Sequence, residues 1–196
     1  MVLFGALARR WMIERPEDDS ALIARLAGGE REAINRLYGR FGRPLFAFAH
    51  EIVGDAGLAE EIVQDTFVAA WKGAARFEGR SSVSSWLFAI TRRQARDRLR
   101  RVQPDQASVE ALETLPAADP EPEAATLAAA TRAELTAALE RLPAKHRECL
   151  LLAFVAELTG PEIAAVLGIP EGTVKSRIHA ARRALRALVA SQEESR

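Results

Sequence analysis

The stretch from Leu158 to Leu188, LTGPEIAAVLGIPEGTVKSRIHAARRALRAL, constrains the fold more than any other part of the chain. Thr159 with Glu162 three residues later is a capping box, which predicts the start of a helix. Apolar residues then recur at helical spacing until Gly168, a residue that readily takes the left-handed conformation ending a helix. Pro170 can begin a second helix. Two helices joined by a glycine turn form the helix-turn-helix pattern, whose second helix enters the DNA major groove.

The second predicted helix has one apolar face and one cationic face. The residues expected to face inward are Val174, Ile178, Ala181 and Leu185. The residues expected to face DNA are Thr173, Lys175, Ser176, Arg177, His179, Arg182 and Arg183. An amphipathic hairpin with an ordinary solvated face is the alternative. The excess of cations and the small hydrogen-bonding side chains near the start of the helix, where base edges would lie, favour DNA binding.

Upstream of this motif the chain has helical periodicity and no strand pattern. The predicted helices are Ala21–Leu26, Glu30–Val53 with a kink or break at Pro44, Leu58–Trp71, and Trp86–Arg101. In the third of them the residues at inward spacing are Ile62, Val63, Phe67 and Val68.

A segment of different composition interrupts the helices. Residues 104–126 contain six acids, no basic residue and four prolines, and such a segment buries too little apolar surface to fold alone. Helices are expected to resume over 127–142 and, after Pro143, over 145–157. We therefore predict an all-α protein of two small helical domains, 20–103 and 127–190, joined by a flexible acidic linker, 104–126. The N-terminal residues 1–19 are predicted to be a disordered extension, with Met12 as an alternative start, and 191–196 a tail.

Charge is segregated along the chain. The totals, 27 Lys and Arg against 27 Asp and Glu, cancel and say nothing about partners. The run TRRQARDRLRR, residues 91–101, nevertheless holds six arginines against the single Asp97. That density favours contact with a phosphate backbone or an acidic partner over simple solvation.

Several functional classes find no support in the sequence. The single cysteine, Cys149, excludes an internal disulfide, fits a reducing cytoplasm and is expected to be a buried thiol. We find no phosphate loop, no metal-ligand cluster and no nucleophile paired with a histidine, so we expect neither an enzyme nor a cofactor. No apolar run approaches the ~20 residues of a membrane span, so we expect no membrane insertion.

Four stretches together resemble the extracytoplasmic-function (ECF) sigma factors of bacterial RNA polymerase. They are AEEIVQDTFVAAW (Ala59–Trp71), FEGRSSVSSWLFAI (Phe77–Ile90), the segment Arg141–Pro170, and GTVKSRIHAARRAL (Gly172–Leu185). The resemblance covers about residues 20–189. It implies a protein that binds core RNA polymerase, recognises and melts promoter DNA, and is commonly held inactive by an anti-sigma factor.

The resemblance also implies roles for individual residues. The residues matching the polymerase-binding helix are Glu61, Gln64, Asp65, Phe67 and Trp71, with a purely structural role as the alternative for the two aromatic residues. The residues matching the part that opens the downstream promoter element and holds the melted non-template strand are Arg80, Ser81, Ser82, Arg92, Arg93, Arg96, Arg98 and Arg100.

Two further implications concern base recognition. Many family members carry Asn where this chain has Arg93. Asn both donates and accepts hydrogen bonds whereas Arg only donates, so the identity of the captured base does not carry over. In the second domain, which resembles the reader of the double-stranded upstream element, Lys175, Ser176 and His179 would face bases. Arg177, Arg182 and Arg183 would face phosphates.

A helix-turn-helix response regulator is the main alternative. Such a protein would carry a phospho-acceptor domain of alternating strands and helices before its DNA reader, and the first domain here has no strand pattern.

Overall fold

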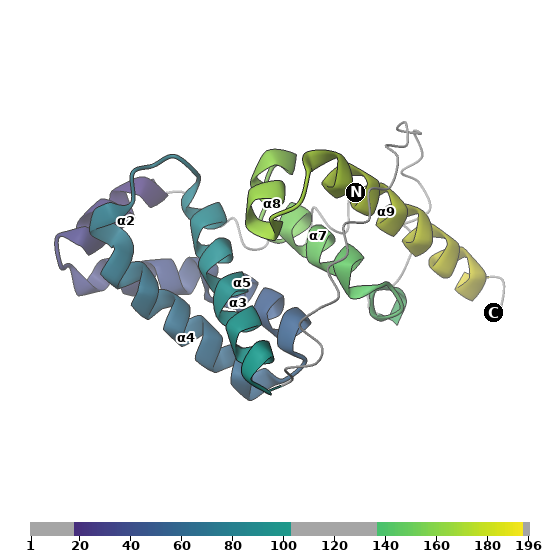
Figure 1. Ribbon diagram of the computed structural model, residues 1–196, viewed down its shortest axis with the longest axis horizontal. Coiled ribbons are helices and arrows are strands. Elements are labelled where there is room, and N and C mark those ends of the chain that lie inside the picture. The colour runs from purple at the N-terminus through teal and green to yellow at the C-terminus, as the bar shows by residue number, and fades with distance from the viewer. Residues whose placement is uncertain (1–17, 103–136, 194–196) are drawn as a thin grey trace.

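The computed structural model describes residues 18–102 and 137–193, and every regular element within these ranges is a helix (Figure 1). The elements are α2 (Asp19–Ala27), α3 (Arg31–Val53), α4 (Ala56–Gly73), the short 3₁₀ helix η1 (Ala74–Arg76), α5 (Val83–Val102), α7 (Ala144–Phe154), α8 (Gly160–Leu167) and α9 (Glu171–Glu193). The predicted all-α class is confirmed. The predicted linker, 104–126, lies outside the described residues, as does the predicted extension up to residue 17. Helix α9 continues three residues into the predicted tail.

The first unit, α2 to α5, is built around the long helix α3, which contacts the three other helices. The buried residues of α3 follow its apolar stripe: Ala33, Leu37, Phe41, Gly42, Leu45, Phe48 and Ala49. The helix passes through Pro44 without ending, so the alternative of a break was wrong. It ends at Gly54, whose φ of 70° is the left-handed conformation open to glycine.

Small side chains allow α4 and α5 to approach closely. Ala59 on α4 and Ala95 on α5 are fully buried. The hydroxyls of Thr66 and Thr91 lie 3.1 Å apart in the same interface, and each also donates to a carbonyl of its own helix. Because these buried polar groups are satisfied, the contact fixes which residues of α4 lie opposite which residues of α5.

The second unit contains the predicted helix-turn-helix. The capping box at the start of α8 is present, with the Thr159 amide donating to Glu162 at 2.9 Å. Gly168 ends α8 with a φ of 64°, and α9 begins one residue after Pro170. Helix α7 ends at Phe154, earlier than predicted, and Glu157 follows in the left-handed region with a φ of 55°.

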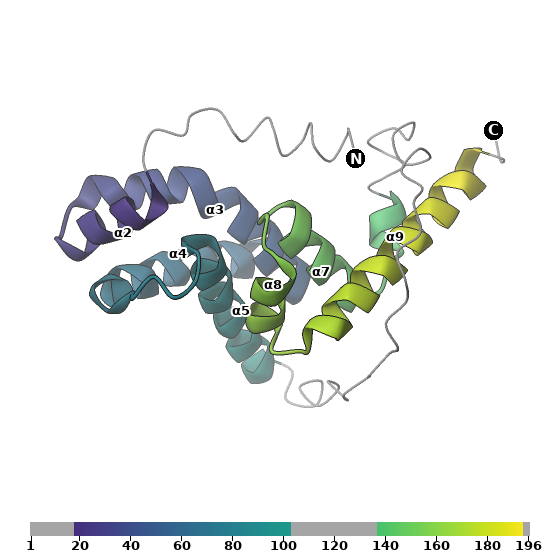
Figure 2. The same ribbon diagram turned by 90° about the horizontal axis from the view of Figure 1, so that it is seen from above.

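The two units pack against each other, an arrangement that the sequence did not predict. Figure 2 shows α7 and α8 lying beside α3 and α5, and one apolar cluster contains buried residues of both units. Polar contacts border it. Arg147 Nε donates to Glu51 Oε1 at 2.6 Å, and Ser84 Oγ donates to the carbonyl of Ala156 at 3.1 Å. In this form the two units make a single body.

Candidate functional site

The outward face of α4 carries most of the residues predicted to bind polymerase. Glu61 and Gln64 are exposed, Asp65 is half-buried, and Trp71 keeps 41% of its surface accessible. Phe67 is different: it is only 4% exposed and its ring packs 5.2 Å from that of Tyr38, which favours the structural alternative for this residue. It supports α4 from beneath because its helical position faces α3.

Sequence reasoning missed an apolar extension of this face. Tyr38 on α3 and Val68 on α4 are 55% and 50% exposed, although the spacing of Val68 predicted an inward position. A groove of about 440 Å³ lies between the two helices, lined by Tyr38, Gly39, Gly42, Arg43 and Phe46 of α3 and by Glu60, Val63 and Gln64 of α4. The exposed face therefore spans both helices, and helical periodicity within one helix could not indicate it.

Arg98 joins the two helices that the resemblance assigns to different tasks. Its guanidinium donates through Nη1 to Glu61 at 2.7 Å and through Nη2 to Asp65 at 2.6 Å. These hydrogen bonds raise the pKa of Arg98 above its ordinary value. Arg98 was predicted to face DNA, and in this structure it faces the carboxylates of α4 instead.

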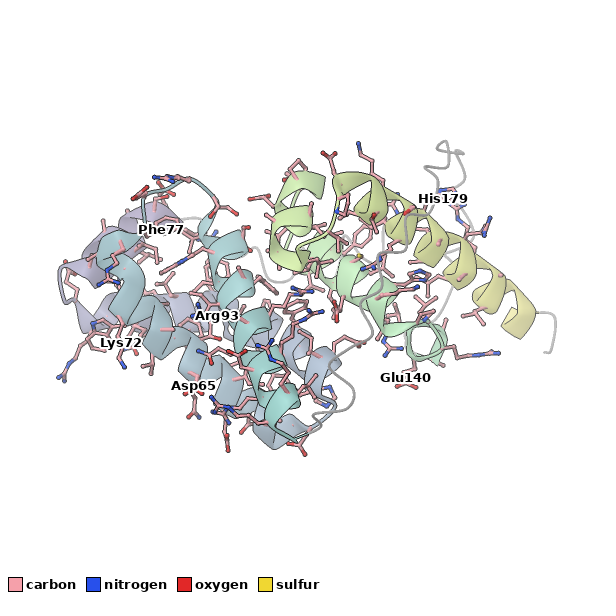
Figure 3. The ribbon with its side chains drawn as sticks, viewed as in Figure 1. Asp65, Lys72, Phe77, Arg93, Glu140 and His179 are labelled. Atoms are coloured by element: carbon pink, nitrogen blue, oxygen red, sulfur yellow. The ribbon has the colours of Figure 1, made fainter. Side chains whose placement is uncertain are left out.

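The remaining arginines of α5 point in different directions. Arg93, labelled in Figure 3, and Arg100 are exposed, although Arg100 also pairs with Asp97 on its own helix. Arg92 and Arg96 are half-buried. The predicted cationic surface is therefore narrower than the sequence count suggests, because consecutive arginines on a helix lie on different faces.

Ser82 anchors the loop before α5 through two hydrogen bonds. Ser82 Oγ accepts from the backbone amide of Ser85, which caps α5, and it donates to Glu162 of α8. Ser81 remains exposed, and Arg80 is exposed and paired with Glu78. Helix α5 begins at Val83, earlier than predicted, because Ser82 supplies the cap that periodicity does not reveal.

Fewer of the residues of α9 that were predicted to face DNA are exposed than the sequence pattern indicates. Lys175, Arg182 and Arg183 are exposed, and Arg177 and His179 are half-buried. Thr173 and Ser176 are only 7% exposed, so their predicted place on the open face was wrong. The hydroxyl of Ser176 donates to the carbonyl of Thr173 at 3.0 Å, which satisfies it within the helix.

The exposed cations of α9 are partly engaged within the protein. Lys175 Nζ lies 2.9 Å from the carboxylate of Glu171, one helical turn earlier. The guanidinium of Arg182 lies over the ring of Phe154, 5.2 Å from its centroid. His179 projects from α9 in the half of the molecule away from Asp65 (Figure 3). The candidate DNA surface on α9 is thus apart from the candidate polymerase surface on α4.

Cys149 is buried, as predicted. Burial raises the pKa of its thiol to about 11, although the nearby cations Arg177 and Arg92 act to lower it. Nowhere in residues 18–102 or 137–193 do three or more metal-ligating side chains gather. No helix in the same ranges combines the length and apolar character needed to cross a membrane.

Comparison with protein families places matches on both units. Residues 37–104 match the family model for Sigma-70 region 2, and residues 132–185 match that for Sigma-70 region 4. The RNA polymerase sigma factor CnrH of Cupriavidus metallidurans is 34% identical over 188 residues, covering 91% of this chain and 98% of the relative. The ECF RNA polymerase sigma factor SigW of Bacillus subtilis is 30% identical, covering 84% of this chain and 92% of the relative.

Solved structures give the same result for the fold. CnrH in complex with the cytosolic domain of CnrY superposes with a TM-score of 0.61 at 29% identity, covering 89% of this chain and 99% of that one. The sigma factor RpoE of Bartonella quintana, in complex with the anti-sigma factor NepR, gives a TM-score of 0.52 at 32% identity, covering 74% and 89%.

Proposed function

Because this chain belongs to the extracytoplasmic-function sigma factors of bacterial RNA polymerase, we propose that its two helical units divide the recognition of polymerase and promoter between separate faces. The chain is an RNA polymerase sigma factor, which binds the core enzyme and directs it to promoters to initiate transcription. The assignment of faces and residues is our proposal.

Helix α4 is the proposed docking element for the core enzyme. The observation that carries this proposal is the pair of carboxylates, Glu61 and Asp65, one turn apart on the outward face of the helix. Gln64 and Trp71 flank them and remain accessible. Such a face offers hydrogen-bond acceptors for a basic partner and an aromatic anchor beside them.

Helix α5 and the loop before it form the proposed surface for the melted downstream element. The predicted residues that are exposed there are Arg80, Ser81, Ser82, Arg93 and Arg100, although the hydroxyl of Ser82 is engaged within the protein. Arginines in this position would track the phosphates of a displaced single strand. Arg92 and Arg96 are half-buried and would contribute less to this surface.

Helix α9 is the proposed reader of the double-stranded upstream element. Lys175 lies in its first turns, where a recognition helix meets base edges. Arg182 and Arg183 lie about two turns further on, where the helix would leave the groove beside the phosphates.

Reconstituted transcription tests this function. Purified protein is added to bacterial core polymerase with a library of randomised promoters, and run-off transcripts are sequenced. A sigma factor makes the otherwise inert core initiate at a shared pair of sequence elements. A helix-turn-helix regulator stays silent until another sigma factor is supplied, and that result would overturn the proposal.

Control by a partner protein extends the proposal. CnrH and the Bartonella RpoE were each solved with a partner, CnrY and the anti-sigma factor NepR respectively. We propose that this chain also has an anti-sigma partner, that it works in the cytoplasm with the polymerase, and that it acts by binding rather than by catalysis. Silence that is relieved by a further activating factor, and not by another sigma factor, would indicate a different form of control.

A further inference from the structure

We propose that Arg98 is a positioning residue for polymerase docking, which holds the Glu61 and Asp65 carboxylates of α4 in the orientation that the core enzyme engages. This inference rests on the proposed docking role of α4. It moves Arg98 from the predicted DNA surface to the support of the polymerase surface.

The geometry of the two hydrogen bonds from the Arg98 guanidinium supports this inference. Arg98 uses separate nitrogens for the two carboxylates, Nη1 at 2.7 Å from Glu61 and Nη2 at 2.6 Å from Asp65. A guanidinium presents these donors in a rigid plane, so both carboxylates are set relative to one another by a single group. The Arg98 side chain is 28% exposed, which places it beside the carboxylates rather than in front of them.

The carboxylates stay available while Arg98 holds them. The Glu61 and Asp65 side chains are 63% and 46% exposed. Arg98 engages only one oxygen of each carboxylate, Oε2 of Glu61 and Oδ2 of Asp65. The group keeps a net charge of −1, because two carboxylates face one guanidinium, and it can still attract a basic partner.

Arg98 also offsets the unfavourable free energy of holding the Glu61 and Asp65 carboxylates close together. Like charges one helical turn apart repel, and long acidic side chains lose rotamer freedom when a partner orders them. A cation between them offsets the repulsion and fixes their rotamers before docking. Preorganisation of this kind raises affinity because fewer side-chain rotamers remain to be ordered when the partner binds.

The packing of α4 on α5 explains why Arg98 reaches this place. Ala95, one turn before Arg98, is fully buried, and the Thr66–Thr91 pair fixes the register of the two helices. Arg98 therefore emerges at the edge of the interface, directly opposite Glu61 and Asp65. A lysine at position 98 would keep the positive charge but would lack the planar set of N–H donors of a guanidinium.

The experiment measures the affinity of the full-length protein for core polymerase without DNA. Replacing Arg98→Met should weaken binding by roughly three- to tenfold, and Arg98→Lys should weaken it less, because one charge-assisted contact remains. Arg101→Met is the matched control: it removes the same charge from the exposed side of the same helix, and core affinity should not change.

A double-mutant cycle separates positioning from a general effect on folding. In a protein carrying Glu61→Gln and Asp65→Asn, the change Arg98→Met should cause no further loss of core affinity. An equal loss in both backgrounds would show that Arg98 acts elsewhere, and tighter binding by Arg98→Met would show that it masks the carboxylates. Either result overturns the inference. If Arg98→Met does not fold, as judged by circular dichroism, the same cycle is run with Arg98→Lys.

The cycle also distinguishes the inference from the proposed function. If the two carboxylate substitutions leave core affinity unchanged, the docking role of α4 itself is wrong. If they weaken it while Arg98→Met does not, the docking role stands and only the positioning role of Arg98 fails.

Discussion

Lys175 and Arg183 lie on one helix, and replacing each of them should nevertheless affect DNA binding in a different way. Lys175→Ala should cost about 1–3 kcal/mol at the preferred upstream element and relax the choice of base there. Arg183→Ala should weaken binding to all sequences alike and lower the salt slope by about one unit. The measurement is holoenzyme binding to matched and altered elements over a salt series. If Arg183→Ala changes the base preference and Lys175→Ala changes only the salt slope, the helix lies in the groove the other way round.

The ion pair between Lys175 and Glu171 adds a second test of the same residue. Because Glu171 holds Lys175 Nζ at 2.9 Å, the lysine must leave this carboxylate to reach a base. Glu171→Gln should therefore tighten promoter binding modestly, by less than about 1 kcal/mol, since exposed pairs on a helix contribute little. The same substitution in a Lys175→Ala protein should have a smaller effect, and an equal effect would point to long-range repulsion of DNA.

The thiol of Cys149 should be nearly inert in the folded protein. With a pKa of about 11, it holds far less reactive thiolate at pH 8 than an ordinary cysteine, by roughly a hundredfold. Labelling with a disulfide reagent should therefore be slow in buffer and fast in denaturant. Because the pKa of Cys149 is higher in the folded protein than in the unfolded chain, the folded protein loses stability as the pH rises past about 9. Fast labelling at pH 8 without unfolding would contradict the burial of this group.

At the level of secondary structure, Glu162 links the start of α8 to the other unit. Burial alone would raise the pKa of its carboxyl, but hydrogen bonds from Ser82 and Thr159 outweigh burial and hold the pKa below its ordinary value. A carboxyl with a lowered folded pKa stabilises the fold above its unfolded pKa, and this contribution is lost as pH falls through the folded value.

Glu162→Gln should therefore lower the free energy of unfolding by about 1 kcal/mol at pH 7. The difference in melting temperature from the unaltered protein should shrink as the pH falls below about 4. Thermal unfolding followed by circular dichroism at several pH values measures this. A difference independent of pH would show that the carboxylate charge contributes nothing there.

The elements differ in how much of them the sequence could predict. The α8 cap and the Gly168 turn are local: each depends on residues within a few positions, so their signals are present in the sequence itself. The Arg98 fork and the burial of Ser176 depend on contacts across helices or on the surroundings of the folded chain. A helical pattern predicts which face is apolar, but it does not predict which neighbour an arginine will contact.

For the whole molecule, the same reason explains why the interface between the units was missed. Helical spacing can indicate that apolar residues such as Phe88 and Ile163 are buried, but it does not predict which other residues of the shared cluster they join. The Arg147–Glu51 pair joins residues 96 positions apart, and no spacing rule reaches that far. The family resemblance predicts the functional class, whereas the packing of the two units depends on contacts that form only in the folded chain.

Separation of the units should follow when this ion pair is broken. The Arg147 and Glu51 side chains are only 26% and 15% exposed, so Glu51→Gln leaves a largely buried guanidinium without its carboxylate. The expected cost is about 1–3 kcal/mol. Small-angle scattering should show a larger radius of gyration than for the unaltered protein. Glu60→Gln, an exposed change on α4, is the control that should leave the dimensions unchanged.

The single apolar cluster shared by both units has a consequence for how the protein melts. Units that bury surface only within themselves unfold independently and give two heat-absorption peaks, whereas units that share a core lose it together. We expect one calorimetric transition, with the enthalpy from its area equal to the enthalpy from its sharpness. Glu51→Gln should broaden or split that peak. The interface would then be the source of cooperativity between two halves that are separate in sequence.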